Sequence, residues 1–448
     1  MTGPVADVRI TGVAVGGAGV AREPAGRVLF VDGALPGELV TVDVVAERRD
    51  HARAVAIAVV EAAPSRVTPP CPFVAEGCGG CGWQHVAVAA QRSLKVDIVA
   101  DALRRLGGVR EPVVAPGPVL PSSGYRTTLR GVADAAGRFA LREHHSHDLV
   151  PVPGCLVAHP LVVEVLAEGR FPPGADVTVR AGARTGERLV VVAAGTAGAR
   201  APGAAGIEAA GTAGTRVAGA VDRDEISVPD GVRVVTGGEL AAGKRAWLYE
   251  EVAGVRLRVS ARSFFQAGPD GAEALIAAVH EAVGEVAEGA RLADLYGGVG
   301  LFATTVGRRA RVELVEASAS SAADARINLR GLDARVVRSD VARWHPRRMG
   351  IVVADPPRSG LGRGGVRAVS AHPRRPGGAR ELRRRCAGAR CPPAGRRRVR
   401  AGVVDAGRRV PAHPPCRGGV AVRAPAGVSP PGRGSTRRRD SSGARRDV

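Results

Sequence analysis

Short apolar runs separated by turn residues fill the first sixty positions of the chain. The runs at 27–31 (RVLFV), 38–45 (ELVTVDVV) and 52–60 (ARAVAIAVV) are broken by glycine and proline turns such as GALPGE. Strand-sized runs bounded by such turns are typical of a small barrel. We therefore expect residues 1–64 to form an OB-like N-terminal β-barrel.

A helical period replaces the strand pattern at 91–106. Leucine, isoleucine, valine and alanine recur there every three or four positions, and Gly107 and Gly108 follow the run. This spacing predicts one amphipathic helix with a glycine cap at its C-terminus. Strand-like runs such as ERLVVVAA (187–194) then return, and the Ala/Gly-rich stretch 195–214 predicts a flexible loop. We expect residues 65–260 to form a β-rich central domain.

The period changes again from residue 272. Apolar positions at 275, 276, 279, 283 and 286 predict an amphipathic helix, and RLADL, RVELVE and MGIVVAD are typical of buried strands. Buried strands that alternate with helices indicate a doubly wound parallel sheet. Residues 261–370 therefore predict a Rossmann-like α/β domain.

Neither period continues beyond about residue 371. Residues 371–448 contain 21 arginines and four acids, so this tail carries +17 of the formal net charge of +21. Its Arg/Pro/Gly/Ala-rich composition favours either a disordered RNA-binding arm or a segment read out of frame in a GC-rich gene. We expect the sheet to end after its fourth strand, which would leave an unprotected edge and a marginally stable or aggregating domain.

The cysteines suggest a metal or cluster site. The N-terminal MTGPVADVRI lacks the features of a secretory signal, and no run of about 18 apolar residues occurs, so we expect a cytoplasmic protein with no membrane partner. Clustered cysteines in a reducing compartment are ligand candidates rather than disulfides. Cys71, Cys78 and Cys81 form C-x6-C-x2-C, and Cys155 follows 74 residues later. Four thiolates can hold an iron-sulfur cluster or a tetrahedral zinc ion, and the spacing leaves both open.

A glycine-rich turn carries candidate cofactor chemistry. The segment ADLYGGVGLFA (293–303) follows a buried strand and opens a helix, so Gly298 and Gly300 can let the backbone approach a ligand. Glu316 ends the next strand, where a carboxylate can bind a ribose hydroxyl. Asp355 begins a rigid proline corner in VVADPPRSG, at the end of a further strand. These positions suit a nucleotide-like cofactor, and a nicotinamide dinucleotide remains an alternative.

Taken in order, these motifs resemble the RNA 5-methyluridine methyltransferases. The resemblance covers roughly residues 6–370 and rests on GGAGVAREPAGRVLFVDGALPGE, PPCPFVAEGCGGCGWQHVAVAAQ, YRTTLR, SFFQ, DLYGGVGLF, VEASASSAADARINL and DPPRSGLG. It implies a TRAM-type RNA-binding barrel, S-adenosylmethionine as methyl donor, and rRNA or tRNA as partner. It also favours a [4Fe-4S] cluster over zinc on the four cysteines. We expect the protein to be a monomer.

The resemblance also assigns roles to single residues. Asp355 opens the family's active-site motif, Asp340 lies where the family contacts adenine, and Arg126 and Arg130 are expected to lie near RNA. The residues expected to bind S-adenosylmethionine are Gln266, Tyr296, Gly298, Gly300, Glu316, Asp340 and Asp355.

Methylation of uracil at C5 needs a nucleophile on the enzyme, because C5 itself is a poor one. A thiolate must add at C6 to create an enolate, and a carboxylate must later remove the C5 proton. In the family the thiol follows the DPPR motif by one strand, near position 382 here, but this chain has ARELRRRCAGARC. Cys386 is the nearest thiol, its arginine neighbours favour a thiolate, and the segment RRVPAHPPCRGG contains no glutamate base. The sequence therefore predicts an RNA uracil-C5 methyltransferase, and the missing nucleophile and base motifs leave its catalytic activity undecided. A noncatalytic RNA-binding protein and a nicotinamide oxidoreductase are the alternatives.

Overall fold

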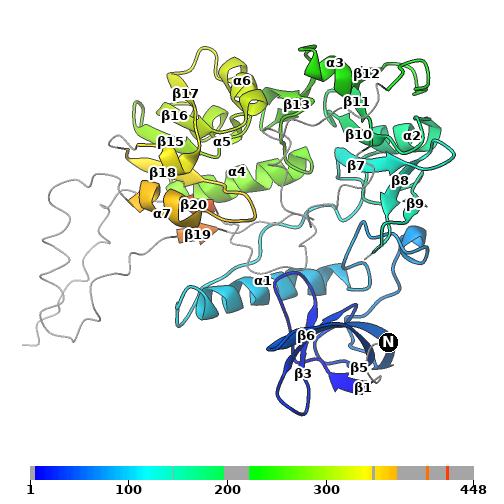
Figure 1. Ribbon diagram of the computed structural model, residues 1–448. Helices are drawn as coiled ribbons and strands as arrows, with labels where there is room; N and C mark the ends of the chain where they lie inside the picture. The colour runs from blue at the N-terminus through cyan, green and yellow to red at the C-terminus, as the bar shows by residue number, and fades with distance from the viewer. Residues whose placement is uncertain are drawn as a thin grey trace, which may run out of the picture.

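The computed structural model describes residues 6–144, 146–195, 221–345, 349–370, 400–402 and 420–422. Figure 1 shows three bodies built on β-sheets: an N-terminal barrel, a central sheet and an α/β body. Helix α1 (Val88–Arg105) runs alongside the barrel (Figure 1) and begins three residues before the helix predicted at 91–106. Within the described part of the chain, no helix is both long and apolar enough to cross a membrane.

The N-terminal barrel has the strand order β1-β5-β6-β4-β3-β2. Strand β5 buries Val40, Val42 and Val44 because successive side chains of a strand point to opposite faces. This alternation confirms the predicted barrel. Its strands are β1 (Ala6–Arg9), β2 (Gly12–Val13), β3 (Gly19–Arg22), β4 (Val28–Asp32), β5 (Leu39–Glu47) and β6 (His51–Glu61).

Two contacts join the barrel to the segment that follows it. The fully buried Glu38 accepts hydrogen bonds from Nη2 of Arg66 at 2.7 Å and from the Leu35 N–H at 2.8 Å. Nε1 of Trp83, five residues before α1, donates to the Gly17 carbonyl at 3.0 Å. Because a buried carboxylate is costly to leave unpaired, these contacts hold the barrel against the start of α1.

The central body is a six-stranded sheet with the order β12-β11-β10-β7-β8-β9. Helix α2 (Pro160–Glu168) packs its apolar side, including Val162 and Val165, against one face of this sheet. The loop predicted at 195–214 lies outside the described residues from position 196 onward. The remaining elements are β7 (Thr128–Ala133), β8 (Phe139–Arg142), β9 (Leu149–Pro151), β10 (Asp176–Ala181), β11 (Arg188–Ala193), β12 (Val232–Thr236) and α3 (Gly237–Ala241).

The α/β body contains four parallel strands in the order β17-β16-β15-β18. Its core also includes Val252 and Leu257 from the hairpin β13-β14, which pack with α4 and the sheet. The elements are β13 (Trp247–Val252), β14 (Val255–Ser260), α4 (Pro269–Val283), β15 (Arg291–Leu295), α5 (Leu301–Thr304), β16 (Arg311–Glu316), α6 (Ala319–Asn328), β17 (Ala334–Arg338), η3 (Val341–Arg343), β18 (Ile351–Ala354) and α7 (Gly362–Ser370).

The expectation that this sheet ends after its fourth strand is wrong. Two short strands from the tail, β19 (Arg400–Gly402) and β20 (Val420–Val422), extend it beyond β18. β20 pairs antiparallel with β18, and β19 pairs antiparallel with β20. These strands are three residues long, too short to show a hydrophobic period among the surrounding Arg, Pro and Gly. The edge of β18 is therefore paired at Val353 and Ala354.

Candidate active site

Three neighbouring strands bring the predicted cofactor residues to one edge of the sheet. Strand β15 lies between β16 and β18, and all three run parallel. Their carboxyl ends therefore meet, which places the loop 296–300, Glu316 and Asp355 side by side. Tyr296 and Gly298 of the loop line one hollow of about 4750 Å³ together with Glu316, Asp355, Gln266 and Asp340. The predicted ligand Gly300 does not line it, because it is buried against Leu314 and Leu329.

The loop after β15 has an unusual backbone. Tyr296 has a φ of 59°, a left-handed conformation that costs a side-chain-bearing residue energy, and Gly300 has a φ of 97°. A Cβ on Gly297 would lie 2.5 Å from Cγ of Leu314 on the neighbouring strand. The loop therefore requires a residue without a side chain at Gly297, where it passes over Leu314 of β16.

The two acids at the rim of the loop accept backbone hydrogen bonds. Glu316 accepts from the Gly298 N–H at 2.9 Å and from the Ser318 N–H at 2.6 Å, so its carboxylate joins the glycine loop to the start of α6. Asp340 accepts from the Ala342 N–H at 2.7 Å and caps η3. Both carboxylates line the hollow, where they can accept hydrogen bonds from a ligand.

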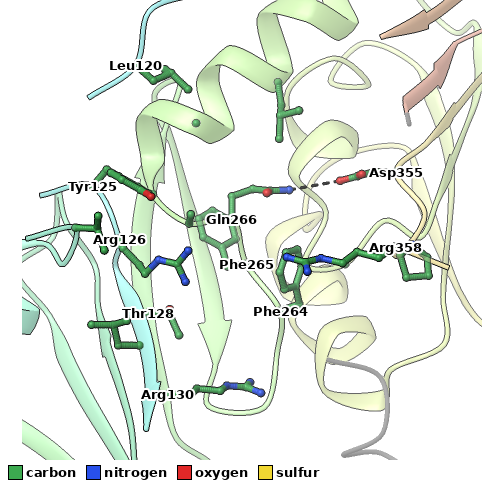
Figure 2. A pocket seen from close by; sticks show the side chains of 18 of the residues that line it. Leu120, Tyr125, Arg126, Thr128, Arg130, Phe264, Phe265, Gln266, Asp355 and Arg358 are labelled. Carbon is green, nitrogen blue, oxygen red and sulfur yellow. Dashed lines mark hydrogen bonds between the residues drawn. The ribbon is translucent and has the colours of Figure 1, made fainter. Parts of the chain in front are cut away.

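Gln266 reaches across the hollow toward the proline corner. Its Nε2 donates to Oδ2 of Asp355 at 3.4 Å, a contact between residues 89 positions apart. Figure 2 shows Phe264 and Phe265 beside Gln266, with Arg358 extending from the opposite wall. Amide, carboxylate and aromatic groups therefore surround a space in which a planar ring could be held by stacking and hydrogen bonds.

Asp294 lies beneath this site and is fully buried in β15. Its Oδ2 accepts from the Ala303 N–H at 3.1 Å, whereas its Oδ1 has no hydrogen-bond partner within the described structure. Burial raises the pKa of Asp294 to about 8, and the negative charges of Asp355 and Glu316 act in the same direction. Asp294 is therefore largely protonated at neutral pH.

Basic side chains line the wall of the hollow that the central sheet provides. Arg126 and Arg130 both lie there, and Figure 2 shows Arg126 near Gln266 and Arg130 farther along the same segment, beyond Thr128. Seventeen arginines and lysines, against six acids, line the hollow within the described residues. An excess of this size attracts a polyanion.

The four predicted ligand cysteines converge on a second, much smaller cavity. Cys71, Cys78, Cys81 and Cys155 all line this space of about 30 Å³, beside the short helix η1 (Pro72–Val74). None of the four forms a disulfide, and burial raises the pKa of Cys155, with Cys81 and Cys71 adding to the effect. In the described residues, no group of His, Cys, Asp or Glu side chains is already arranged to hold a metal ion. The chemistry of four converging thiols nevertheless fits a thiolate-ligated group.

The predicted nucleophile is not placed by this structure. Cys386 lies outside the described residues. Cys81 is the one cysteine of the described part that lines the large hollow, and it also borders the four-cysteine cavity. The structure thus places the residues predicted to bind the cofactor and the arginines expected near RNA around one hollow, without assigning the thiol.

Comparison with known proteins identifies the family. The TRAM domain model matches residues 1–57. An uncharacterized RNA methyltransferase from Streptomyces avermitilis is 34% identical over 382 residues, covering 80% of this chain and 84% of the relative. A 23S rRNA (uracil(1939)-C(5))-methyltransferase, RlmD, from Methylococcus capsulatus is 41% identical over 144 residues, covering 31% of this chain and 32% of the relative. The chain belongs to the TRAM-containing RNA methyltransferases.

The fold agrees with this family. The tRNA (uracil-54, C5)-methyltransferase of Pyrococcus abyssi, solved with S-adenosyl-L-homocysteine, superposes with a TM-score of 0.55 at 20% identity. The match covers 82% of this chain and 87% of that protein. This RNA methyltransferase therefore shares its fold with that solved structure across most of both chains.

Sequence reasoning missed three buried charged residues around the site. Asp294, Arg180 and Asp324 are each almost fully buried. Strand alternation in DVTVRA places Arg180 on the face opposite Val177 and Val179, which predicts an exposed side chain rather than the buried one observed. The partners of Asp324 lie more than sixty positions away in the chain, so no local pattern could have shown them.

Proposed function

We propose that this protein uses S-adenosylmethionine to methylate C5 of a uridine in rRNA or tRNA. One observation carries the proposal: the glycine loop, Glu316, Gln266 and Asp355 share a single hollow with the arginines of the central sheet. A methyl donor and an RNA strand can therefore reach the same place.

Each proposed cofactor residue contacts a different part of S-adenosylmethionine. Glu316, already bound by two N–H groups, is placed to accept hydrogen bonds from ribose hydroxyls. Asp340 at the start of η3 is proposed to contact the adenine, and Gln266 and Tyr296 to hold the amino-acid part of the ligand. When bound, S-adenosylmethionine supplies an electrophilic methyl group on a sulfonium centre.

The uridine is proposed to lie between Gln266 and the corner at Asp355. The Asp355 carboxylate can accept a uracil N–H, and Phe264 or Phe265 can stack on an unpaired base. Base-modifying enzymes reach their target by taking the base out of the helical stack. Arg126 and Arg130 are proposed to bind the neighbouring phosphates, which positions the strand without reading its sequence.

The covalent step requires a thiolate at C6 and a carboxylate base at C5. Cys386 remains the proposed nucleophile. It can be tested with RNA that carries 5-fluorouridine, because fluorine at C5 cannot leave as a proton and the adduct accumulates. A denaturation-resistant complex that disappears in Cys386→Ser would support this residue, and a complex that persists would exclude it.

We also propose that the four cysteines hold a [4Fe-4S] cluster. The convergence of Cys71, Cys78, Cys81 and Cys155 on one cavity supports this proposal. Anaerobically purified protein should then be brown, absorb near ~400 nm and contain about four iron atoms per chain. A colourless protein with one zinc ion would support the alternative thiolate site.

The activity itself is tested by methyl transfer from labelled S-adenosylmethionine to unmodified rRNA and tRNA. Label should be recovered in 5-methyluridine, and Glu316→Gln should abolish most of it. If label transfer is absent while RNA still binds, the protein is a noncatalytic RNA-binding member of the family. Binding of a nicotinamide dinucleotide in place of S-adenosylmethionine would instead favour an oxidoreductase.

A further inference from the structure

A short turn connects β14 to the segment that carries Gln266. The turn spans Ser260 to Ser263, and the Ser263 N–H donates to the Ser260 carbonyl at 2.9 Å. Phe264, Phe265 and Gln266 follow at once and line the hollow. Because only two residues separate Ser263 from Gln266, a displacement of this turn displaces the Gln266 side chain.

Asp324 holds the turn from the side of the α/β body. This carboxylate lies on α6, is fully buried, and accepts from the Ser260 N–H and the Ser260 hydroxyl, each at 2.7 Å. It also accepts from the Ser263 hydroxyl at 2.6 Å and from Nε of Arg258 at 2.8 Å. Four donors therefore converge on one side chain, which leaves the turn little freedom.

Arg180 holds the same turn from the opposite side. It belongs to β10 of the central sheet and is 3% exposed. Its Nη1 donates to the Ser260 carbonyl at 2.7 Å, and its Nη2 donates to the Ser263 carbonyl. Burial lowers the pKa of Arg180 to about 10, with the nearby charge of Arg130 acting in the same direction and that of Asp324 opposing it. The turn thus lies between two buried, opposite charges that come from different bodies of the protein.

Helix α6 connects this turn to the other wall of the cofactor site. Asn328 lies one helical turn after Asp324, and its Nδ2 donates to the carbonyl of Val299, between the two loop glycines, at 2.9 Å. Its Oδ1 accepts from the Arg258 N–H at 2.8 Å. Helix α6 therefore contacts both the segment before Gln266 and the glycine loop, and it sets the distance between them.

From these contacts we infer that Asp324 and Arg180 are positioning residues for the cofactor site. They fix the turn at 260–263 and thereby hold Gln266 at the distance from the glycine loop that the ligand requires. The inference rests on the proposed function for the identity of that ligand. It also implies that the central sheet, through Arg180, takes part in binding the methyl donor.

The test compares variants of the full-length chain by equilibrium dialysis with labelled S-adenosylmethionine. Asp324→Asn replaces one acceptor oxygen by a donor that faces other donors, and should weaken binding about tenfold or more. Arg180→Lys keeps the charge but cannot reach two carbonyls at once, and should weaken binding severalfold. RNA affinity should stay within about twofold of wild type for Asp324→Asn, because this residue does not face the RNA wall.

A matched destabilised variant separates positioning from a general loss of stability. Val279→Ala removes buried volume from α4, in the same core but away from the turn. It should lower the melting temperature at least as much as Asp324→Asn and leave S-adenosylmethionine affinity unchanged. Equal weakening in Val279→Ala, or wild-type affinity in a folded Asp324→Asn, would overturn the inference.

Hydrogen exchange supplies a readout that does not depend on the ligand. Amide protection at 261–267 should fall in Asp324→Asn and Arg180→Lys and stay high in Val279→Ala. If the wild-type chain binds no S-adenosylmethionine, the proposed function fails on its own. Loss of protection confined to 261–267 would still support the turn as the element that these residues order, and unchanged protection would refute it.

Discussion

Asp294 offers a direct test of the electrostatics beneath the cofactor site. Its ordinary pKa is 3.8, whereas burial, aided by the charges of Asp355 and Glu316, raises the pKa to about 8 in the folded protein. Between about pH 4 and pH 8 the folded state therefore binds one more proton than the unfolded state. Over this window the contribution of Asp294 to the free energy of unfolding falls as pH rises, by up to about 1.4 kcal/mol per pH unit, and this contribution is constant on either side.

The substitution Asp294→Asn removes this titration. At pH ~7 the wild-type carboxyl lowers the free energy of unfolding by about 4 kcal/mol relative to acidic solution. The amide of the Asp294→Asn variant does not titrate, so the variant does not lose this free energy as pH rises. Its NH₂ group, however, occupies a position without a described hydrogen-bond partner, which costs about 1–3 kcal/mol. The stability curves should therefore cross between about pH 4.5 and pH 6, and at pH ~8 the variant should be more stable by about 2–4 kcal/mol.

Urea unfolding from about pH 5 to pH 8.5, followed by the fluorescence of Trp344, measures this difference. Trp344 is buried in the α/β body and donates to Oε1 of Glu313 at 2.6 Å, and Trp83→Phe and Trp247→Phe remove the other two indoles. Asp333→Asn is the control, because the substitution is chemically the same and this carboxylate is 71% exposed. An Asp294→Asn curve that runs parallel to the wild-type curve would refute the reasoning, because it would show that Asp294 takes up no proton on folding.

Three further outcomes follow from the described contacts. Glu316→Gln leaves one acceptor for two N–H groups, so S-adenosylmethionine binding by equilibrium dialysis should weaken about tenfold; an unchanged dissociation constant would contradict the ribose role. Glu38→Gln should lower the stability of the barrel by about 3–5 kcal/mol in thermal unfolding, and replacing both Glu38 and Arg66 with methionine should restore most of it; a loss under about 1 kcal/mol would show that the pair is unimportant. Arg130→Gln should reduce the slope of log affinity for RNA against log salt by about 1, whereas Arg335→Gln, which lies outside the hollow, should not; equal slopes for Arg130→Gln and wild type would argue against a phosphate contact.

The sequence predicted those parts of the fold that leave local signals. Short apolar runs separated by glycine and proline turns identified the barrel, and strands followed by helices identified the α/β body with its loop at Gly298 and Gly300. Glu316 and Asp355 were predictable site residues because acids at the ends of successive parallel strands must meet at one edge. The tail strands could not be predicted, because three-residue strands carry no period and their pairing with β18 is set by tertiary contacts.

The buried charges could not be predicted for a different reason. Arg180 and Asp324 both form hydrogen bonds with the turn at 260–263. This turn lies about eighty positions from Arg180 and about sixty positions from Asp324 in the chain. In sequence, an arginine in a strand and an aspartate in a helix are typical of solvated surface positions. Asp294 likewise follows an apolar run, and the run alone does not show that its carboxyl stays protonated. Burial and partners come only from the assembled fold.

The hairpin β13-β14 has a practical consequence for anyone who wishes to dissect the molecule. A fragment cut just after Ser260 would omit Val252 and Leu257, which pack with α4 and the parallel sheet, and would also omit Arg180. Such a fragment would expose apolar surface of the α/β body, and its turn at 260–263 would lack the hydrogen bonds from Arg180. The α/β body therefore cannot be transferred to another protein on its own. Truncated or chimeric proteins must include the hairpin β13-β14 and strand β10 with it.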